Sequence, residues 1–280
     1  MILSIIASKK DIAGMNIKEV LQDEFGFIDS GAIFHGSAVL KKGRTCLYTV
    51  ETDSVDCNRI DREIDSDIIV FASRHQGSDC RPIFSCHTPG NWAEAGMGGI
   101  SSELCICPAA LLKETFLILK QEHERSGLAG FEVTLECTHH GPYLEKPCIY
   151  IEIGSKEEQW KDKNAARVIC RTLSRLSSEQ EAVANPKARA VFGIGGPHYC
   201  NSFNRIQDNT ELSVGHICPK YMLSHLDKQM IGKAIERTMP KPDLILLDWK
   251  GLGSEKQRIQ SVLDELGIAY KKTKEIKYDP

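Results

Sequence analysis

Short apolar runs rich in β-branched residues alternate along the chain with longer amphipathic stretches. The apolar runs predict strands, which we expect at residues 2–7, 32–39, 45–52, 67–73, 103–107, 131–138, 147–153, 189–194, 211–217, 243–248 and 268–272. Apolar residues at helical spacing predict helices at 15–25, 108–126, 156–177, 224–238 and 254–266. This alternation is typical of an α/β protein.

Residues at the ends of the predicted helices support their placement. Pro108 can occupy a first helical turn, where its missing N–H is not needed. Ser155 stands three residues before Glu158, which is the spacing of a capping box. Ser254 opens the last helix, and Gly267 closes it in the left-handed conformation that glycine adopts readily.

The character of the strands predicts how the sheet is built. The continuous apolar runs at 68–71 and 244–247 indicate strands covered on both faces. The early strands resemble hairpins, so part of the sheet should be antiparallel. We therefore expect a single three-layer α/β/α domain with a mixed sheet over residues 1–280. The second half could form a subdomain, but no change in composition marks a boundary.

Composition narrows the class of protein. With 41% hydrophobic and 26% charged side chains, the 280-residue chain is typical of a globular protein. Its uncharged apolar runs are too short to span a membrane. The apolar N-terminus lacks a preceding basic segment and is expected to form a first strand rather than a signal peptide. Eleven cysteines without a C-x-x-C pair indicate reduced thiols and a cytoplasmic protein.

The formal net charge of −3 argues against strong, general binding of nucleic acid. Any RNA contact must therefore use local basic patches. One candidate is a stripe of four cations spaced four residues apart, Lys163, Arg167, Arg171 and Arg175, for which a solvated helix face is the favoured interpretation. Residues Lys41, Lys42 and Arg44, in a predicted hairpin turn, form a second small patch.

Histidines beside glycine or proline follow several predicted strands. Four motifs contain them: Ser73-Arg74-His75-Gln76-Gly77-Ser78, Cys86-His87-Thr88-Pro89-Gly90-Asn91-Trp92, Thr138-His139-His140-Gly141-Pro142 and Gly195-Gly196-Pro197-His198-Tyr199. Gly215-His216 is a weaker fifth candidate. Ligands of open α/β sheets sit beyond the carboxyl ends of the strands. We therefore expect these imidazoles to share one pocket at one rim of the sheet.

The chemistry available to such a pocket is hydrolytic. Imidazole carries protons near neutral pH and binds metals when neutral. Potential zinc ligands are Glu136, His139, His140, His198 and His216. In a strand, the adjacent His139 and His140 would point apart unless the chain turns there. Spacing alone leaves zinc open, because no H-E-x-x-H motif is present, and the absence of G-x-S-x-G disfavours a nucleophilic serine.

Together, and in this order, the four motifs resemble those of the archaeal and plant type of D-aminoacyl-tRNA deacylase. The resemblance extends over about the full chain, although Pro197 stands where the family usually has a third glycine. It implies a fold related to phosphorylases and peptidyl-tRNA hydrolases. It also implies hydrolysis of the ester between a D-amino acid and tRNA, a form of chiral proofreading, with zinc as cofactor.

From this resemblance we expect His75, His87, His140 and His198 to be catalytic. Substrate contacts are expected from six further residues, Arg74, Gly90, Asn91, Gly195, Gly196 and Tyr199. Backbone N–H groups of the glycines would stabilise an oxyanion, and Trp92 and Tyr199 could stack on the terminal adenine. The protein is expected to be a monomer.

Two other functions stay open from the sequence. A metal-dependent peptidase or amidohydrolase would cleave small amides without needing the nucleotide. A non-catalytic tRNA- or nucleotide-binding protein would bind tRNA whatever its acyl group and would release no amino acid. Release of amino acid from D- and L-tyrosyl-tRNA, with and without a chelator, separates the three.

Overall fold

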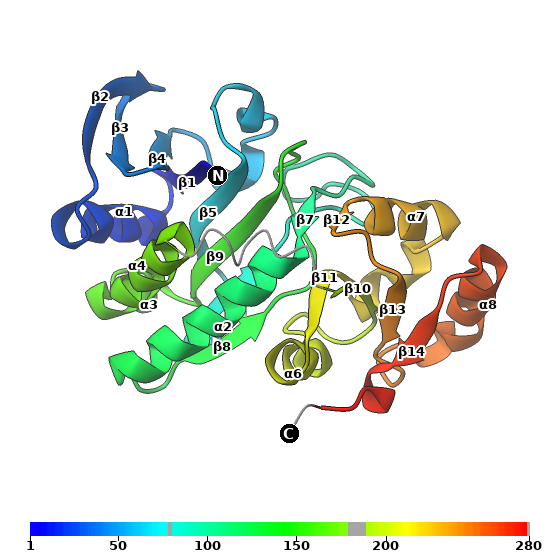
Figure 1. The fold of residues 1–280 in the computed structure, drawn as a ribbon. Helices are drawn as coiled ribbons and strands as arrows, with labels where there is room; N and C mark the ends of the chain where they lie inside the picture. Colours follow the sequence, from blue (N-terminus) through cyan, green and yellow to red (C-terminus); the bar gives the residue numbers. More distant parts are fainter. Residues whose placement is uncertain (78–79, 179–188, 279–280) are drawn as a thin grey trace.

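The predicted alternation of strands and helices is confirmed by a computed structural model, which describes residues 1–77, 80–178 and 189–278 (Figure 1). The strands are β1 (Leu3–Ser8), β2 (Ile28–Phe34), β3 (Ser37–Lys42), β4 (Thr45–Val50), β5 (Ile68–His75), β6 (Ile83–His87), β7 (Cys107–Pro108), β8 (Glu132–Leu135), β9 (Cys148–Gly154), β10 (Arg189–Ile194), β11 (Leu212–Cys218), β12 (Thr238–Met239), β13 (Leu244–Leu247) and β14 (Tyr270–Lys272). The helices are α1 (Ile12–Glu24), α2 (Ala109–Ser126), α3 (Glu157–Trp160), α4 (Lys163–Ser178), α6 (Asn201–Asn209), α7 (Lys228–Glu236) and α8 (Lys256–Leu266). Short 3₁₀ turns lie at Ser54–Asp56, Ile60–Arg62, Lys220–His225, Gly253–Glu255 and Thr273–Glu275.

The larger sheet has eight strands in the order β2-β3-β4-β1-β5-β9-β6-β8. Strands β4, β1, β5 and β9 run parallel, whereas β2-β3, β3-β4 and β9-β6 are antiparallel pairs. The sheet is therefore mixed, as predicted. A second sheet of four parallel strands, β11-β10-β13-β14, is formed by the last third of the chain. A two-stranded pair of β7 and β12 is separate from both.

Among the residues that the structure describes, helices cover only one face of the larger sheet. Helices α1, α2 and α4 pack there, and the core beneath them includes Val70, Ile149 and Ile151. The opposite face carries Phe71 and Tyr150, whose rings stack with centroids 4.7 Å apart. That face is covered by 3₁₀ turns and irregular segments instead of helices. It is the face on which the functional side chains meet.

The second sheet has helices on both faces, because its apolar side chains alternate between two cores. Val191 and Leu246 face the core shared with α2 and α6, whereas Phe192, Ile245 and Leu247 face α7 and α8. Helix α2 contacts both sheets and joins the two halves of the molecule (Figure 1). The α/β architecture is confirmed, and the four-stranded sheet in the second half is the feature that composition did not reveal.

Several predicted boundaries were wrong for local reasons. The strand expected at 32–39 is a hairpin, because His35 and Gly36 adopt left-handed conformations, with φ of 47° and 73°, between β2 and β3. The run at 103–107 makes only isolated bridges before the two-residue β7. The helix expected at 156–177 is divided into α3 and α4, and Asp162 accepts the N–H of Asn164 where the second begins.

Strand β6 and helix α6 are among the elements that were not predicted. Strand β6 is fully buried, but Ser85 and His87 interrupt its apolar pattern. Helix α6 is short and mostly polar, with only Phe203, Ile206 and Gln207 buried. At the other helix ends, Gly267 closes α8 with φ of 63° as predicted, whereas Ser254 lies in a 3₁₀ turn before the helix.

The basic stripe on α4 is engaged in helix packing. Lys163 pairs with Glu19 of α1, Arg167 with Glu24 at the end of α1, and Arg175 with Glu122 of α2. These ion pairs engage three of the four cations and favour the structural interpretation over an RNA-binding one. Among the residues described, no helix is long and apolar enough to cross a membrane.

Candidate active site

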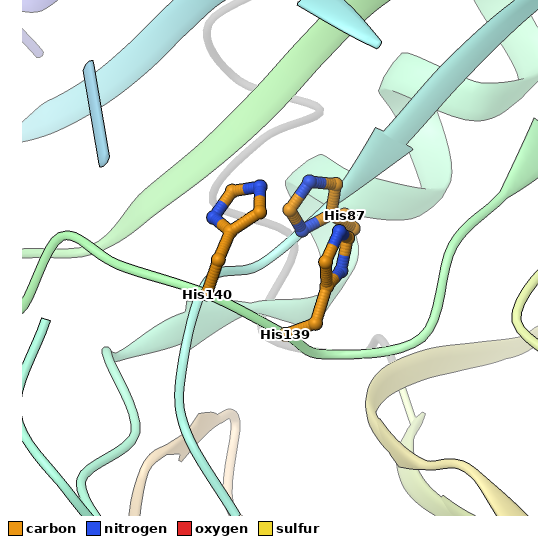
Figure 2. A group of neighbouring side chains, drawn as sticks. All are labelled: His87, His139 and His140. Atoms are coloured by element: carbon orange, nitrogen blue, oxygen red, sulfur yellow. The ribbon is translucent and has the colours of Figure 1, made fainter. Parts of the chain in front are cut away.

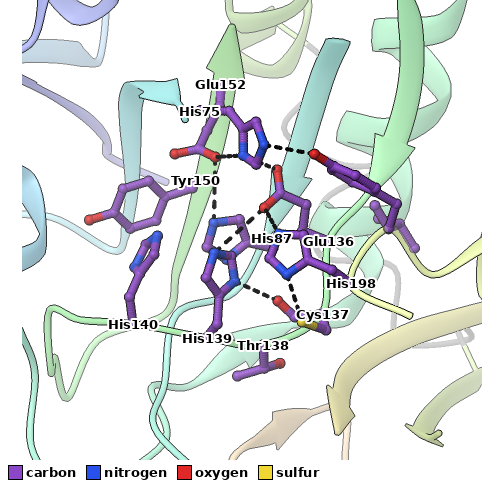
Figure 3. Close-up of polar contacts among 12 residues, drawn as sticks. His75, His87, Glu136, Cys137, Thr138, His139, His140, Tyr150, Glu152 and His198 are labelled. Atoms are coloured by element: carbon purple, nitrogen blue, oxygen red, sulfur yellow. Dashed lines mark hydrogen bonds and ion pairs between the residues drawn. The ribbon is translucent and has the colours of Figure 1, made fainter. Parts of the chain in front are cut away.

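Five imidazoles from four distant segments meet in one cluster, as the sequence predicted. Neighbouring ring centroids are 4.4 Å apart for His87 and His139, 4.2 Å for His139 and His140, and 4.7 Å for His139 and His198. The His75 ring lies 6.0 Å from that of His198. Figure 3 shows the cluster and its polar contacts.

The register of the larger sheet explains why these residues meet. Glu152 of β9 pairs with Ser73 of β5, two residues before His75, and His87 of β6 pairs with Tyr150 of β9. Cross-strand partners point to the same face, and so do residues two apart. These side chains therefore share the face without helices. Because β6 runs antiparallel to β9, the site extends from the carboxyl end of β5 onto the sheet face, rather than lying at one rim as expected.

Glu136 is the central carboxylate of the cluster. It is 2% exposed and follows β8, where its N–H bonds to the Cys86 carbonyl beside His87. Its Oε2 lies 2.8 Å from His198 Nε2, and its Oε1 lies 2.9 Å from His75 Nδ1. The Nε2 of His139 lies 3.5 Å from Oε2. One buried carboxylate thus contacts three imidazoles.

The protonation of the cluster divides into a charged part and a neutral part. Burial opposes a charge on His75 and His198. The carboxylates of Glu136 and Glu152 nevertheless raise the pKa of His75 to about 10, and Cys137 and Glu136 raise the pKa of His198 to about 10. Burial raises the pKa of Glu136 and its imidazole partners lower it, so the net shift is well below the ordinary carboxyl value. The charged part is a carboxylate between two imidazoliums.

The neutral part consists of His87, His139 and His140, shown in Figure 2. Burial lowers the pKa of His87 to about 3 and that of His140 to about 4, and it lowers the pKa of His139 well below its ordinary value. One nitrogen from each ring can be chosen so that all three atoms lie within 4.8 Å of one another. Uncharged imidazoles this close together are typical metal ligands.

The backbone turns His139 and His140 toward the same space. His140 has φ of 42°, which is the turn needed to bring adjacent side chains together. Nδ1 of His139 is 2.8 Å from the Cys137 carbonyl, and Nδ1 of His140 is 2.6 Å from the Gly141 carbonyl. Each Nδ1–H is therefore a donor to a carbonyl oxygen, and each Nε2 is left as an acceptor. Carbonyl partners fix the tautomer of metal-binding histidines in this way.

His87 is fully buried, and neither of its ring nitrogens has a hydrogen-bond partner among the residues described. Its ring stacks on Tyr150 with centroids 5.1 Å apart and planes 9° apart. The nearest acid is Glu152, whose Oε2 lies 3.8 Å from Nε2. Two unsatisfied nitrogens are costly in a buried position, so this ring fits a site whose occupant supplies the missing bond.

Glu152 is a member of the cluster that the sequence analysis did not identify. It is 2% exposed, and its Oε2 lies 3.7 Å from His75 Nδ1. Burial raises its pKa to about 7, although His75 lowers it in part. A carboxyl group that titrates near neutral pH suits proton transfer. The sequence feature that could have identified Glu152 is an acidic residue in an otherwise apolar strand. It stands at a position where β9 is buried on both faces.

The cluster opens into a cavity of about 410 Å³. From the cluster, the lining includes His75, His139, His140, Glu152 and His198 but not His87 or Glu136, and it also includes Arg74, Gln76, Val55 and Met97. The guanidinium of Arg74 donates to the Lys10 carbonyl and lies 3.5 Å from Asp53, so it is held at the wall of the cavity. A substrate contact of Arg74 stays a prediction that this position supports.

Tyr199 and Tyr221 hold two of the imidazoles. The hydroxyl of Tyr199 is 3.1 Å from His75 Nε2, and the guanidinium of Arg81 lies 4.9 Å from the centroid of the Tyr199 ring. The hydroxyl of Tyr221 is 3.2 Å from His198 Nδ1. Tyr199 was expected to contact substrate. Its hydroxyl here orients His75, and the substrate contact stays a prediction.

Three of the four backbone N–H groups expected to bind an oxyanion, those of Gly90, Asn91 and Gly195, donate hydrogen bonds within the fold. The N–H of Gly90 donates to the carbonyls of His139 and His140, and that of Asn91 donates to the Glu103 carbonyl. The N–H of Gly195 donates to the Cys218 carbonyl, and a Cβ on Gly196 would lie 3.0 Å from Asp248. These residues shape the turns that carry the histidines.

Trp92, for which stacking on the adenine and packing in the core were both open, is a packing residue. It is 1% exposed, and its indole N–H donates to the Thr138 carbonyl. Its ring stacks on Phe192 with centroids 5.8 Å apart. Trp92 is therefore part of the core, and it supports the segment that carries His139.

His216 does not join the cluster. It is fully buried, with Nδ1 3.0 Å from the Thr138 hydroxyl and Nε2 3.0 Å from the Cys105 carbonyl. Both nitrogens are therefore used by the fold, and the expected metal role is not supported. Among the predicted metal ligands, His139 and His140 belong to the neutral part of the cluster, whereas Glu136 and His198 belong to the charged part.

A His216→Asn substitution should separate these roles. We expect the free energy of unfolding to fall by about 1–3 kcal/mol, because one buried hydrogen bond is lost. The zinc content of the purified protein should not change. Urea titration and metal analysis test both statements, and a loss of zinc from a folded variant would restore His216 as a ligand.

Acidification should destabilise the metal-free protein. Burial lowers the pKa of His87 to about 3 and of His140 and His216 to about 4, against 6.5 for ordinary imidazole. The unfolded chain therefore binds more protons below about pH 6.5, and stability is lost as the pH falls through that window. Between pH 7 and pH 5 the free energy of unfolding should drop by about 2 kcal/mol or more.

The raised pKa values act in the other direction but are too few to reverse this trend. His75 and His198 contribute stability that is fully present below about pH 6.5 and is lost as the pH rises toward 10. Glu152 likewise favours the folded state on acidification toward pH 4.5. Urea titrations in the presence of chelator at pH 7 and pH 5 measure the net change in the free energy of unfolding. An equal or greater free energy of unfolding at pH 5 would contradict the prediction.

Comparison with known proteins identifies the family. The family described as D-aminoacyl-tRNA deacylase matches residues 62–271. The D-aminoacyl-tRNA deacylase of Thermococcus kodakarensis is 36% identical over 275 residues, which cover 95% of this chain and 98% of that protein. The enzymes of that name from Thermococcus onnurineus and Pyrococcus abyssi are 35% and 36% identical over 274 residues, with the same coverage.

A solved structure has the same fold. It is a crystal structure described as a conserved protein of unknown function, with a TM-score of 0.86 and 29% sequence identity. The alignment covers 99% of this chain and 96% of that one. The match in sequence over nearly the full length, together with a cluster built from the four histidine motifs, leads to one conclusion: the chain belongs to the D-aminoacyl-tRNA deacylase family.

Proposed function

We propose that the protein hydrolyses the ester bond of D-aminoacyl-tRNA at the cluster of five imidazoles and two carboxylates. The observation that carries this proposal is the convergence of His75, His87, His139, His140 and His198 around Glu136 and Glu152 beside a cavity. Membership of the family gives the substrate class. The same membership does not favour an amide-cleaving enzyme or a non-catalytic tRNA-binding protein.

Zinc fits the neutral part of the cluster. His139 and His140 present acceptor nitrogens, and His87 has no partner for either nitrogen among the residues described. These three residues would hold the ion, leaving room for water as in catalytic zinc sites. Bound zinc supplies Lewis acidity that makes water a stronger nucleophile near neutral pH. The ligand set thus differs from the sequence prediction by including His87 and by leaving out Glu136, His198 and His216.

Glu152 and the charged part of the cluster carry the protons of the reaction. Water attacks the carbonyl carbon of the ester, and the bond to the ribose oxygen breaks. Glu152, with its pKa of about 7, accepts a proton from the water. The imidazolium of His198, held by Glu136, donates a proton to the leaving ribose oxygen. The products are a free D-amino acid and tRNA.

The negative charge that develops on the carbonyl oxygen needs a positive neighbour. The backbone N–H groups of Gly90 and Gly195 are already bonded within the protein. The His75 imidazolium lines the cavity and is fixed by Glu136 and Tyr199. A preorganised charge of this kind stabilises an oxyanion without reorganisation during the reaction.

The test is release of amino acid from D- and L-tyrosyl-tRNA, with and without a chelator. We expect release from the D-ester and not from the L-ester. Chelator should reduce the rate by at least about 10²-fold, and added zinc should restore it. Absence of release from the D-ester by the metal-loaded protein would refute the function. An unchanged rate in chelator would refute the role of zinc but not the proposed hydrolysis.

A cytoplasmic location and a monomeric state stay predictions. Nine of the eleven cysteines are buried, and these nine are free thiols. Reduced thiols are expected in a reducing compartment, which is also where tRNA is aminoacylated. Gel filtration tests the monomer directly.

A further inference from the structure

We infer that a surface beside the active site docks the phosphate backbone of the tRNA acceptor arm. It consists of Trp249, Lys250, Lys256 and Lys272, here called the lysine platform. The inference rests on the proposed function, which requires the end of a long polyanion to reach the cluster. A net charge of −3 gives the protein no general attraction for RNA, so docking needs a local basic surface.

The platform gathers positive charges from three elements onto one indole. Trp249 lies in the loop after β13, Lys256 is the first residue of α8, and Lys272 is the last residue of β14. The Lys256 ammonium is 5.5 Å from the centroid of the indole, and the Lys272 ammonium is 4.3 Å from it. Lys250 is exposed next to the tryptophan. The electron-rich indole face offsets the repulsion between the two ammoniums.

These lysines are not neutralised by the protein. Within residues 1–77, 80–178 and 189–278, no acidic side chain forms an ion pair with Lys250, Lys256 or Lys272. In the basic stripe of α4, in contrast, three of the four cations are paired with acids of neighbouring helices. Unpaired ammoniums held together retain their attraction for an incoming phosphate, whereas most of the charge of the stripe is already paired.

The platform adjoins the active site through a tight backbone contact. The loop after β13 packs on the turn of Gly195 and Gly196, so closely that a Cβ on Gly251 would lie 2.2 Å from Gly196 N. His198 follows this turn by two residues. RNA seated on the lysines would therefore lie next to the wall from which His198 enters the cluster. Trp249 is half-buried, so the surface lacks the apolar centre typical of a protein interface.

Binding of uncharged tRNA tests the platform without relying on hydrolysis. The test variant carries Lys250→Gln, Lys256→Gln and Lys272→Gln. A matched variant removes three charges from the β3–β4 turn, with Lys41→Gln, Lys42→Gln and Arg44→Gln; Figure 1 shows that turn at the other end of the molecule from β14 and α8. A third variant replaces the three platform lysines with arginine.

We expect the glutamine variant of the platform to bind uncharged tRNA at least about tenfold more weakly at 0.1 M salt, on the order of the loss of a few phosphate contacts. The slope of log Kd against log salt should fall by about 2–3. The arginine variant and the β3–β4 variant should bind within about twofold of wild type. Hydrolysis of D-tyrosyl-adenosine, which has no phosphate backbone, should be the same in all four proteins.

Unchanged tRNA affinity in the glutamine variant would overturn the inference, as would an equal loss in the β3–β4 variant. Competition by polyglutamate as effective as that by tRNA would also overturn it, in favour of an acidic protein partner. Loss of D-tyrosyl-adenosine hydrolysis in the folded glutamine variant would mean that the lysines act through the cluster, which again contradicts docking. Failure of the wild type to hydrolyse D-tyrosyl-adenosine would count against the proposed function, and the tRNA affinities would still decide the docking.

Discussion

Replacing Glu136 with glutamine should reduce the rate of D-tyrosyl-tRNA hydrolysis by at least about 10³-fold. The amide keeps the shape of the side chain but removes the charge that holds His75 and His198 protonated. Burial then drives both imidazoles toward the neutral form. The protein loses its proton donor and its positive charge beside the carbonyl together. Single-turnover kinetics at pH 7 measures the loss.

A matched control is available on the surface. Glu63 lies 2.9 Å from His35 in an exposed pair. Glu63→Gln makes the same chemical change outside the cavity and should leave the rate unchanged, because an exposed pair contributes little. A folded Glu136→Gln variant within tenfold of the wild-type rate would show that the central carboxylate is not needed for hydrolysis.

Replacing His140 with alanine should also abolish hydrolysis, by at least about 10³-fold, and should reduce zinc content. His140 is neutral and presents Nε2 beside His87 and His139. Removing it leaves two of the three proposed ligands. His198→Ala should lose a similar share of activity for another reason, namely the missing proton donor, and should retain zinc.

The exposed His35 provides the control for these alanine variants, because it lies outside the cluster. His35→Ala should retain both zinc and activity. Metal analysis and turnover are measured on each variant after urea titration has confirmed that it is folded. Normal turnover in folded His140→Ala would remove this residue from the mechanism.

Much of the site could be predicted from sequence because its histidines are marked by local chemistry. His75, His87, His139, His140 and His198 each stand beside glycine or proline or in a run of polar residues at a strand end. Turns of that kind can be recognised from the sequence alone. Their order along the chain also carried the family resemblance, which the comparisons confirm.

The remaining features depend on pairing between strands, which a single sequence does not reveal. Glu152 belongs to the cluster because β5 and β6 flank β9 and place His75 and His87 on its face. His216 has the same local signal as the others, but its ring lies between Thr138 and the Cys105 carbonyl. The burial and partners of a residue therefore decided its role where the local pattern could not.

For the fold as well, the local sequence pattern predicted some strands and missed others. Strands with continuous apolar runs, such as β5 and β13, were placed nearly to the residue. Strand β6 was missed because the same polar side chains that serve the site interrupt its pattern. The separate second sheet could not be foreseen either, because β10 and β11 have the same apolar character as strands of the first sheet.

The central claim is spatial: the ester is cleaved at the imidazole–carboxylate cluster. A crystal structure with an amide-linked, non-hydrolysable analogue of D-tyrosyl-adenosine tests it most directly. The account predicts the carbonyl group of the analogue in the 410 Å³ cavity, beside His75 and His198. A larger cavity of about 670 Å³ lies near Met222 and Asp227, away from the cluster. An analogue bound there, with the imidazoles untouched, would contradict the account.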